Sequence, residues 1–159
     1  LGGVDMNVEA SFSDTGYSFT QGMMHMNGEE ALVYARERYA YTEGDRQRTK
    51  NQQQVLMGIV KEVTKPSVIT NYAAIMDTMA NTFSTTMSNE EITDLIKYQL
   101  NNNPTWKMEQ YMVDGTGDTL MCAELGDAAS VMVPDQSTVK MAKDKINAVL
   151  AGKSSEDVK

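Results

Sequence analysis

The chain has 159 residues, of which 41% are hydrophobic and 23% are charged, an ordinary composition for a globular domain with a real core. Its formal net charge of -8 and sequence pI near 4.6 argue against a general nucleic-acid-binding surface, because such surfaces are basic. The single cysteine excludes an internal disulfide, and no stretch is long and apolar enough to predict a transmembrane helix.

The first part of the chain predicts a strand, a polar connection and a helix. Residues 1–9 alternate loosely between apolar and polar side chains, which is typical of a strand with one buried face. Its apolar side holds Val4, Met6 and Val8. Residues 11–26 are polar and predict a loop with short extended pieces. Asn27 is the expected N-cap of a helix over residues 28–36, whose inward side chains would be Ala31, Leu32 and Ala35.

Three helices are predicted in the middle of the chain. Gly44 forms a turn and Asp45 is the expected N-cap of a helix that Pro66 stops. The predicted apolar stripe of this helix is Val55, Leu56, Ile59, Val60 and Val63. A second helix is expected over residues 66–80. A third begins after Ser88, which resembles the start of a capping box, and ends at residues 101–104.

The last third of the chain predicts strands followed by one helix. The expected strands are 106–113, 119–123 and 130–133. The first two would form a hairpin around the turn at residues 114–117. Asp135 opens the final helix, which Gly152 ends, and residues 153–159 are a polar tail that we expect to be disordered.

Three single residues each leave two interpretations open. Asp5 lies on the polar side of the first strand, where it would hold an arginine or a metal, or serve as an edge carboxylate. His25 is the only histidine, and without a second ligand nearby it does not predict a zinc site; a general base and a structural residue remain as alternatives. Cys122 is either a buried strand residue or a reactive thiol.

Four arginines fall within thirteen positions of this acidic chain: Arg36, Arg38, Arg46 and Arg48. A guanidinium carries a planar fork of donors that suits phosphate or carboxylate. Arg48 and Gln52 are four apart near a predicted helix N-terminus, where free amides and the helix dipole favour an anion. Arg36 and Arg38 share a side only if the backbone is extended there, so the preceding helix should end near Arg36. The alternative is a solvated face in which the arginines pair with Glu37, Glu43 and Asp45.

This block resembles the signature of the LytR-CpsA-Psr family of cell-envelope phosphotransferases. The matching residues are Ala35-Arg36-Glu37-Arg38, Gly44-Asp45, Arg48 and Asn51-Gln52-Gln53. Weaker similarities occur in residues 1–5, 26–32 and 131–135, so the resemblance covers about positions 1–150. It implies an enzyme that moves a glycopolymer, such as wall teichoic acid or a capsular or secondary cell-wall polysaccharide, from a polyprenyl-pyrophosphate carrier onto peptidoglycan. The implied place of action is the extracytoplasmic face of the plasma membrane.

The resemblance also implies roles for individual residues. Arg36, Arg38 and Arg48 match the pyrophosphate-binding arginines and would stabilise charge in the transition state. Gln52 would position a phosphate oxygen, and Asp45 would cap the helix and orient an arginine. A role for Asp45 as base is disfavoured, because an N-cap carboxylate is strongly acidic. The resemblance also implies Mg²⁺ as a cofactor. Asn51 departs from the family pattern, because many relatives carry a basic residue at this position.

The implied fold is α/β, with a central mixed β-sheet flanked by helices in an α-β-α sandwich. One such domain would occupy residues 1–152. In the family the domain begins well before the segment that Leu1 resembles, so we expect the N-terminal strands, an acidic metal ligand, further arginines and a membrane-anchoring helix to be missing from this chain. The apolar helix stripes leave two alternatives, a core or a tunnel for the polyprenyl chain. The function also leaves alternatives: a non-catalytic module that binds polyprenyl-phosphate lipids, a transcriptional attenuator or a purely structural domain.

Overall fold

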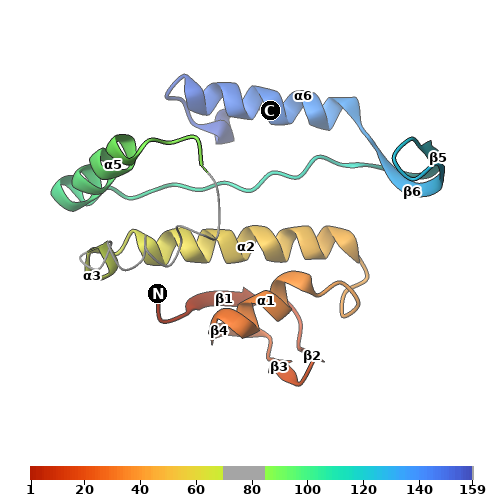
Figure 1. The fold of residues 1–159 in the computed structure, drawn as a ribbon, viewed down its shortest axis with the longest axis horizontal. Coiled ribbons are helices and arrows are strands. Elements are labelled where there is room, and N and C mark those ends of the chain that lie inside the picture. The colour runs from red at the N-terminus through yellow and green to blue at the C-terminus, as the bar shows by residue number, and fades with distance from the viewer. Residues whose placement is uncertain (70–84, 159) are drawn as a thin grey trace. The chain divides into compact units, whose positions relative to one another are not determined.

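The computed structural model describes residues 1–69 and 85–158, which divide into two compact units, Leu1–Trp106 and Lys107–Lys159 (Figure 1). Each unit is described by itself. Among the described residues, no helix has the length and apolar character needed to cross a membrane. The predicted helix over residues 66–80 begins as α3 (Pro66–Ile69), and its remainder lies outside the described residues.

The first unit is built on two antiparallel strand pairs. β1 (Val4–Val8) pairs with β4 (Gly22–Met26), and its side chains alternate between buried and exposed as predicted. β2 (Phe12–Asp14) pairs with β3 (Tyr17–Phe19) across a tight turn in which Thr15 and Gly16 both have positive φ. The buried hydrophobic core of this unit consists of Val4, Met6, Val8, Phe19, Met26, Ala31 and Tyr34.

α1 (Gly28–Arg36) begins and ends where the sequence predicts. Asn27 accepts from the backbone amides of Glu29 and Glu30, and the Glu30 carboxylate reaches back to the Asn27 amide in a capping box. The predicted inward position of Leu32 is wrong, because this side chain is 51% exposed while Tyr34 is fully buried. Ala31 and Tyr34 are three apart and share one helix face, from which Leu32 is rotated by one residue.

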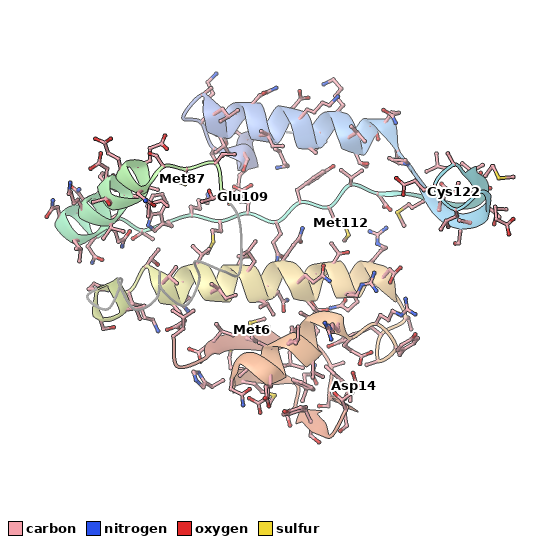
Figure 2. All side chains as sticks on the ribbon, viewed as in Figure 1. Met6, Asp14, Met87, Glu109, Met112 and Cys122 are labelled. Carbon is pink, nitrogen blue, oxygen red and sulfur yellow. The ribbon has the colours of Figure 1, made fainter. Side chains whose placement is uncertain are left out.

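α2 (Asp45–Val63) runs alongside β1 and α1 (Figure 1). Gly58 allows α2 to lie close to β1, because a Cβ there would lie 3.3 Å from Met6 Sδ and 3.3 Å from Val4 Cβ. Met6 is labelled in Figure 2. Val55 and Ile59 pack against the core as predicted, but Leu56 is exposed. The buried positions of the helix are instead Gln47, Asn51, Gly58 and Glu62, three of which are polar.

α5 (Asn89–Asn102) confirms the helix predicted after Ser88. Ser88 and Glu91 form a capping box, and Asn103 ends the helix in the left-handed conformation at φ 42°. Buried Gln99 donates to the backbone carbonyl of Thr64 at 3.0 Å and accepts a hydrogen bond from the Trp106 indole, which fastens the helix to the end of α2.

The second unit contains a hairpin that differs from the predicted one. β5 (Gly115–Cys122) pairs antiparallel with β6 (Asp127–Pro134), so its partner is the following segment. The strand predicted over 106–113 is wrong, because residues 103–114 have no regular structure. Their sequence alternates, but alternation alone supplies no partner for the backbone hydrogen bonds. The observed turn closes at Gly126, whose amide donates to the Cys122 carbonyl at 2.9 Å.

The C-terminal helix follows prediction, and the tail differs from it. α6 (Gln136–Leu150) is capped by Asp135, whose carboxylate accepts from the Ser137 amide at 2.8 Å. In place of the expected disorder, the tail forms a short 3-10 helix, η1 (Ser155–Asp157). Lys145 donates to the Ser155 carbonyl at 2.6 Å, and the Ser155 hydroxyl bonds the Glu109 carboxylate. These contacts hold a segment whose composition alone suggests no order.

The α/β class is confirmed by this combination of helices and strands. The described strands form three two-stranded sheets, and every pair is antiparallel. The parallel pairings of the predicted mixed sheet are therefore not found among the described residues. β2–β3 and β5–β6 are hairpins with short connections, which can only be antiparallel.

Candidate functional site

The candidate site lies where α1 ends and α2 begins. α1 ends at Arg36, and Glu37 is extended, with φ -63° and ψ 133°, as the spacing of the arginines predicts. The Glu37 carboxylate is buried and accepts from the backbone amides of Tyr39 and Ala40. Tyr41 anchors the loop further along, because its ring packs edge-on against the ring of Phe12, with 5.9 Å between the two ring centroids. The backbone that carries Arg38 is therefore held on both sides.

Two arginines converge on one carboxylate at the first turn of α2. Asp45 Oδ1 lies 3.6 Å from Arg38 Nη1 and 3.2 Å from Arg48 Nη2. The predicted N-cap role of Asp45 is wrong. Gly44 is the N-cap, at φ 52° where glycine is favoured, and it makes no side-chain cap bond. Asp45 is the first helical residue, and its carboxylate turns toward the two guanidinium groups instead.

Arg38 has a second partner in its neighbour Tyr39. Its Nη2 donates to the Tyr39 hydroxyl at 2.5 Å, and its Cζ lies 4.8 Å from the centre of the tyrosine ring. The hydrogen bond to Tyr39, together with the nearby Asp45 carboxylate, raises the pKa of Arg38 further above its ordinary value. The guanidinium is therefore charged at physiological pH.

Arg36 and Gln52 occupy the adjoining turns. Arg36 is exposed in the last turn of α1, and Gln52 is exposed one turn after Arg48 on the same face of α2. Neither side chain has a hydrogen-bond or ion-pair partner among residues 1–69 and 85–158. Their donors face solvent and are available to a ligand.

The competing interpretation, a solvated face of paired charges, fits Asp45 and Glu43, which pair with basic side chains, but it does not fit Glu37. Asp45 does pair with arginines. Glu37 uses one carboxylate oxygen for backbone amides of the loop. Glu43 pairs with Lys50 at 2.5 Å, and this hydrogen bond lowers the pKa of Glu43 below its usual range. Two of the three acids therefore pair with basic side chains, and the third fixes the backbone of the loop.

Sequence reasoning missed the buried polar residues behind the arginines. Asn51 is fully buried; its Nδ2 donates to the Tyr34 carbonyl at 3.0 Å, and its Oδ1 accepts from Gln47 Nε2 at 3.0 Å. Gln47 is also bonded to the Glu9 carboxylate at 3.2 Å. Helical spacing held a signal for these residues, because positions 47, 51, 58 and 62 lie on one face of α2.

The residues described here do not form a magnesium site by themselves. No group of three or more His, Cys, Asp or Glu side chains comes together within the described ranges. Asp45, the acid closest to the arginines, already contacts two guanidinium groups, which would repel a cation.

The structure also resolves the alternatives for Asp5. Asp5 faces His25 across the β1–β4 pair, with Oδ1 2.8 Å from His25 Nδ1. The other ring nitrogen of His25 lies 3.1 Å from the Gly2 carbonyl. Asp5 is thus a cross-strand partner of the histidine. Cys122 is a free thiol of intermediate exposure at the end of β5.

Comparison with known proteins defines the class to which this fold and site belong. The model of the LytR_cpsA_psr family matches residues 1–148. The chain therefore belongs to the LytR-CpsA-Psr family.

Named relatives agree with this assignment. The chain is 34% identical over 118 residues to the polyisoprenyl-teichoic acid–peptidoglycan teichoic acid transferase TagU of Enterococcus faecalis, covering 74% of this chain and 38% of the relative. It is 35% identical over 95 residues to TagU of Bacillus subtilis, covering 60% of this chain and 31% of the relative.

Solved structures of the family share the fold. The crystal structure of B. subtilis TagU matches 93% of this chain and 57% of that chain, with 25% identity and a TM-score of 0.61. That of B. subtilis TagV matches 87% of this chain and 53% of that chain, with 26% identity and a TM-score of 0.64. The chain thus spans about half of these solved domains and about a third of the two curated relatives.

Proposed function

We propose that this chain is the pyrophosphate-holding part of a phosphotransferase that moves a glycopolymer from a polyprenyl-pyrophosphate carrier onto peptidoglycan. The observation that carries the proposal is the convergence of Arg38 and Arg48 on Asp45 Oδ1. The names of the TagU relatives support the substrate class, because they are described as polyisoprenyl-teichoic acid–peptidoglycan teichoic acid transferases.

The proposed site residues are Arg36, Arg38, Asp45, Arg48 and Gln52. Each guanidinium carries five N–H donors, so one contact with Asp45 leaves most of them for phosphate oxygens. The first turn of α2 adds the positive end of the helix dipole. Asp45 holds two like charges together until a more highly charged pyrophosphate takes its place.

The proposed reaction is transfer of a glycopolymer phosphate. A hydroxyl of peptidoglycan attacks the phosphorus nearest the glycopolymer, and a new P–O bond forms. The bond from that phosphorus to the bridging oxygen breaks, so polyprenyl phosphate leaves and the hydroxyl proton passes to solvent. The arginines would neutralise the charge that builds on the phosphate oxygens. Mg²⁺ belongs to the proposal as the family's cofactor, although the described residues of this chain do not supply its ligands.

The proposal also includes a place of action. The TagU relatives are named for the transfer of teichoic acid to peptidoglycan, which is a polymer of the cell envelope. We place the proposed enzyme on the extracytoplasmic face of the plasma membrane, where a polyprenyl carrier and peptidoglycan meet. Anchoring would come from an N-terminal helix outside the present sequence.

Binding of geranyl pyrophosphate to the chain and to Arg48→Ala, with and without Mg²⁺, tests the proposal by calorimetry. A charge-assisted hydrogen bond contributes about 1.5–3 kcal/mol, so we expect Kd to rise by roughly tenfold or more in the variant. Lys97→Ala is the matched control, because it removes one positive charge from an exposed pair with Asp94 on α5. Equal weakening by both substitutions, or no effect of Arg48→Ala, would contradict the proposal.

A further inference from the structure

We propose that Asn51 is a positioning residue that sets the spacing between the arginine at the end of α1 and those at the start of α2. The inference rests on the proposed function and adds to it a residue that touches no substrate. The structure gives Asn51 a physical role, because its buried side chain bonds Tyr34 of α1 and Gln47 of α2.

The hydrogen bond from Asn51 joins α2 to the last turn of α1. Tyr34, whose carbonyl accepts from Asn51 Nδ2 at 3.0 Å, lies in the last turn of α1 and two residues before Arg36. Asn51 itself lies three residues after Arg48 and directly before Gln52. One hydrogen bond therefore links the turn that carries Arg36 to the turn that carries Arg48 and Gln52.

Burial and hydrogen bonding hold the Asn51 side chain in place. Asn51 is fully buried, so breaking its hydrogen bonds would leave polar groups without water to replace them. Gln47 Nε2 donates to Asn51 Oδ1 at 3.0 Å, which requires the amide of Asn51 to point its Nδ2 toward Tyr34. Gln47 is held in turn by the exposed Glu9 carboxylate of the neighbouring segment. The amide thus has one available orientation.

The spacing of the two helix ends affects a pyrophosphate more than a monophosphate. A pyrophosphate carries two phosphate groups and contacts donors from both helix ends at once, whereas a monophosphate is satisfied by one end. Misplacement of one binding group relative to the other by about 1 Å weakens a ligand that must contact both groups together. Loss of the Asn51 link should therefore weaken pyrophosphate binding selectively.

The experiment compares two probes, geranyl pyrophosphate and geranyl monophosphate, on the wild-type chain and on Asn51→Ala. We expect Kd for the pyrophosphate to rise about tenfold, the size of one lost charge-assisted contact, and Kd for the monophosphate to change less than about twofold. Val55→Ala is the matched control: it removes core contacts one turn further along α2 and should lower stability without changing the ratio of the two Kd values.

A second variant covers the case in which Asn51→Ala does not fold. Gln47→Met removes the donor that orients the Asn51 amide and keeps Asn51 itself, while Glu9 is exposed and can bind water instead. It should shift the Kd ratio in the same direction by a smaller factor. The positioning role is overturned if the folded variants bind both probes more weakly by the same factor, or if the ratio of the two Kd values is unchanged in them.

The outcomes separate the two proposals. If Arg48→Ala weakens pyrophosphate binding and the Asn51 and Gln47 variants leave the ratio unchanged, the phosphate site stands and the positioning role falls. If the wild-type chain binds neither probe, or Arg48→Ala binds the pyrophosphate as the wild type does, the phosphate site falls and the positioning role falls with it.

Discussion

Asp45 combines two roles that pull in opposite directions. Its carboxylate brings Arg38 and Arg48 together, yet it occupies donors that a phosphate would use. Asp45 is well exposed and the two arginines are partly exposed, and such ion pairs contribute little to stability because water and salt screen them. The contacts of Asp45 are therefore easily exchanged for contacts with a doubly charged group. Arg38 would keep its orientation during the exchange, since Tyr39 holds it independently.

The contact between His25 and Asp5 predicts a pH dependence at the scale of single residues. The hydrogen bond to Asp5 raises the pKa of His25 above 6.5, and the same bond lowers the pKa of Asp5 below 3.8. The His25 contribution to stability is complete below about pH 6.5 and is lost as pH rises through the raised pKa. The Asp5 contribution is present above about pH 3.9 and is lost as pH falls through the lowered pKa.

NMR titration of His25 tests this pair. In Asp5→Asn the pKa of His25 should fall back toward its ordinary value, because the negative partner is gone while the Gly2 carbonyl remains. Asp14→Asn removes the same charge from β2, outside the β1–β4 pair, and should leave the titration of His25 unchanged. A His25 pKa that is the same in the wild type and in Asp5→Asn would show that the carboxylate has no influence.

Gly58 supports a prediction at the scale of elements, where α2 packs on β1. A Cβ at this position already lies 3.3 Å from Met6 Sδ and Val4 Cβ, so the branches of a valine would overlap the strand. We expect Gly58→Val to lower the free energy of unfolding by roughly 1–3 kcal/mol, the usual cost of overpacking. Gly28→Val, at a helical glycine with no atom near its Cβ position, is the control in urea denaturation. Equal losses in the two variants would contradict close packing at Gly58.

Elements whose ends depend on local chemistry could be predicted from the sequence, and elements that depend on distant partners could not. Asn27 and Ser88 bond backbone amides of their own helices, so both helix starts were visible in the sequence. The partner of β5 and the burial of Asn51 depend on which segment arrives beside them in space. For the site, the spacing of Arg36 and Arg38 predicted the end of α1, but the cap at Gly44 depended on a backbone angle that composition does not specify.

At the scale of the whole molecule, every proposed phosphate-binding residue lies in the first unit. The second unit, Lys107–Lys159, has its own hairpin, helix and tail, and Ser155 bonds Glu109 within it. Ser155→Ala should destabilise this unit, because it leaves the carboxylate of Glu109 without its hydroxyl donor. Faster hydrogen exchange confined to residues 107–158 would be the sign of that loss.

The same Ser155→Ala variant should bind geranyl pyrophosphate with unchanged Kd, since Arg36, Arg38 and Arg48 all belong to the first unit. Lys140→Ala, which removes an exposed ion pair with Asp144 on α6, is the control and should change neither measurement. A weaker Kd in Ser155→Ala would mean that the second unit contributes to ligand binding. The phosphate site would then have to be redrawn to include residues beyond Trp106.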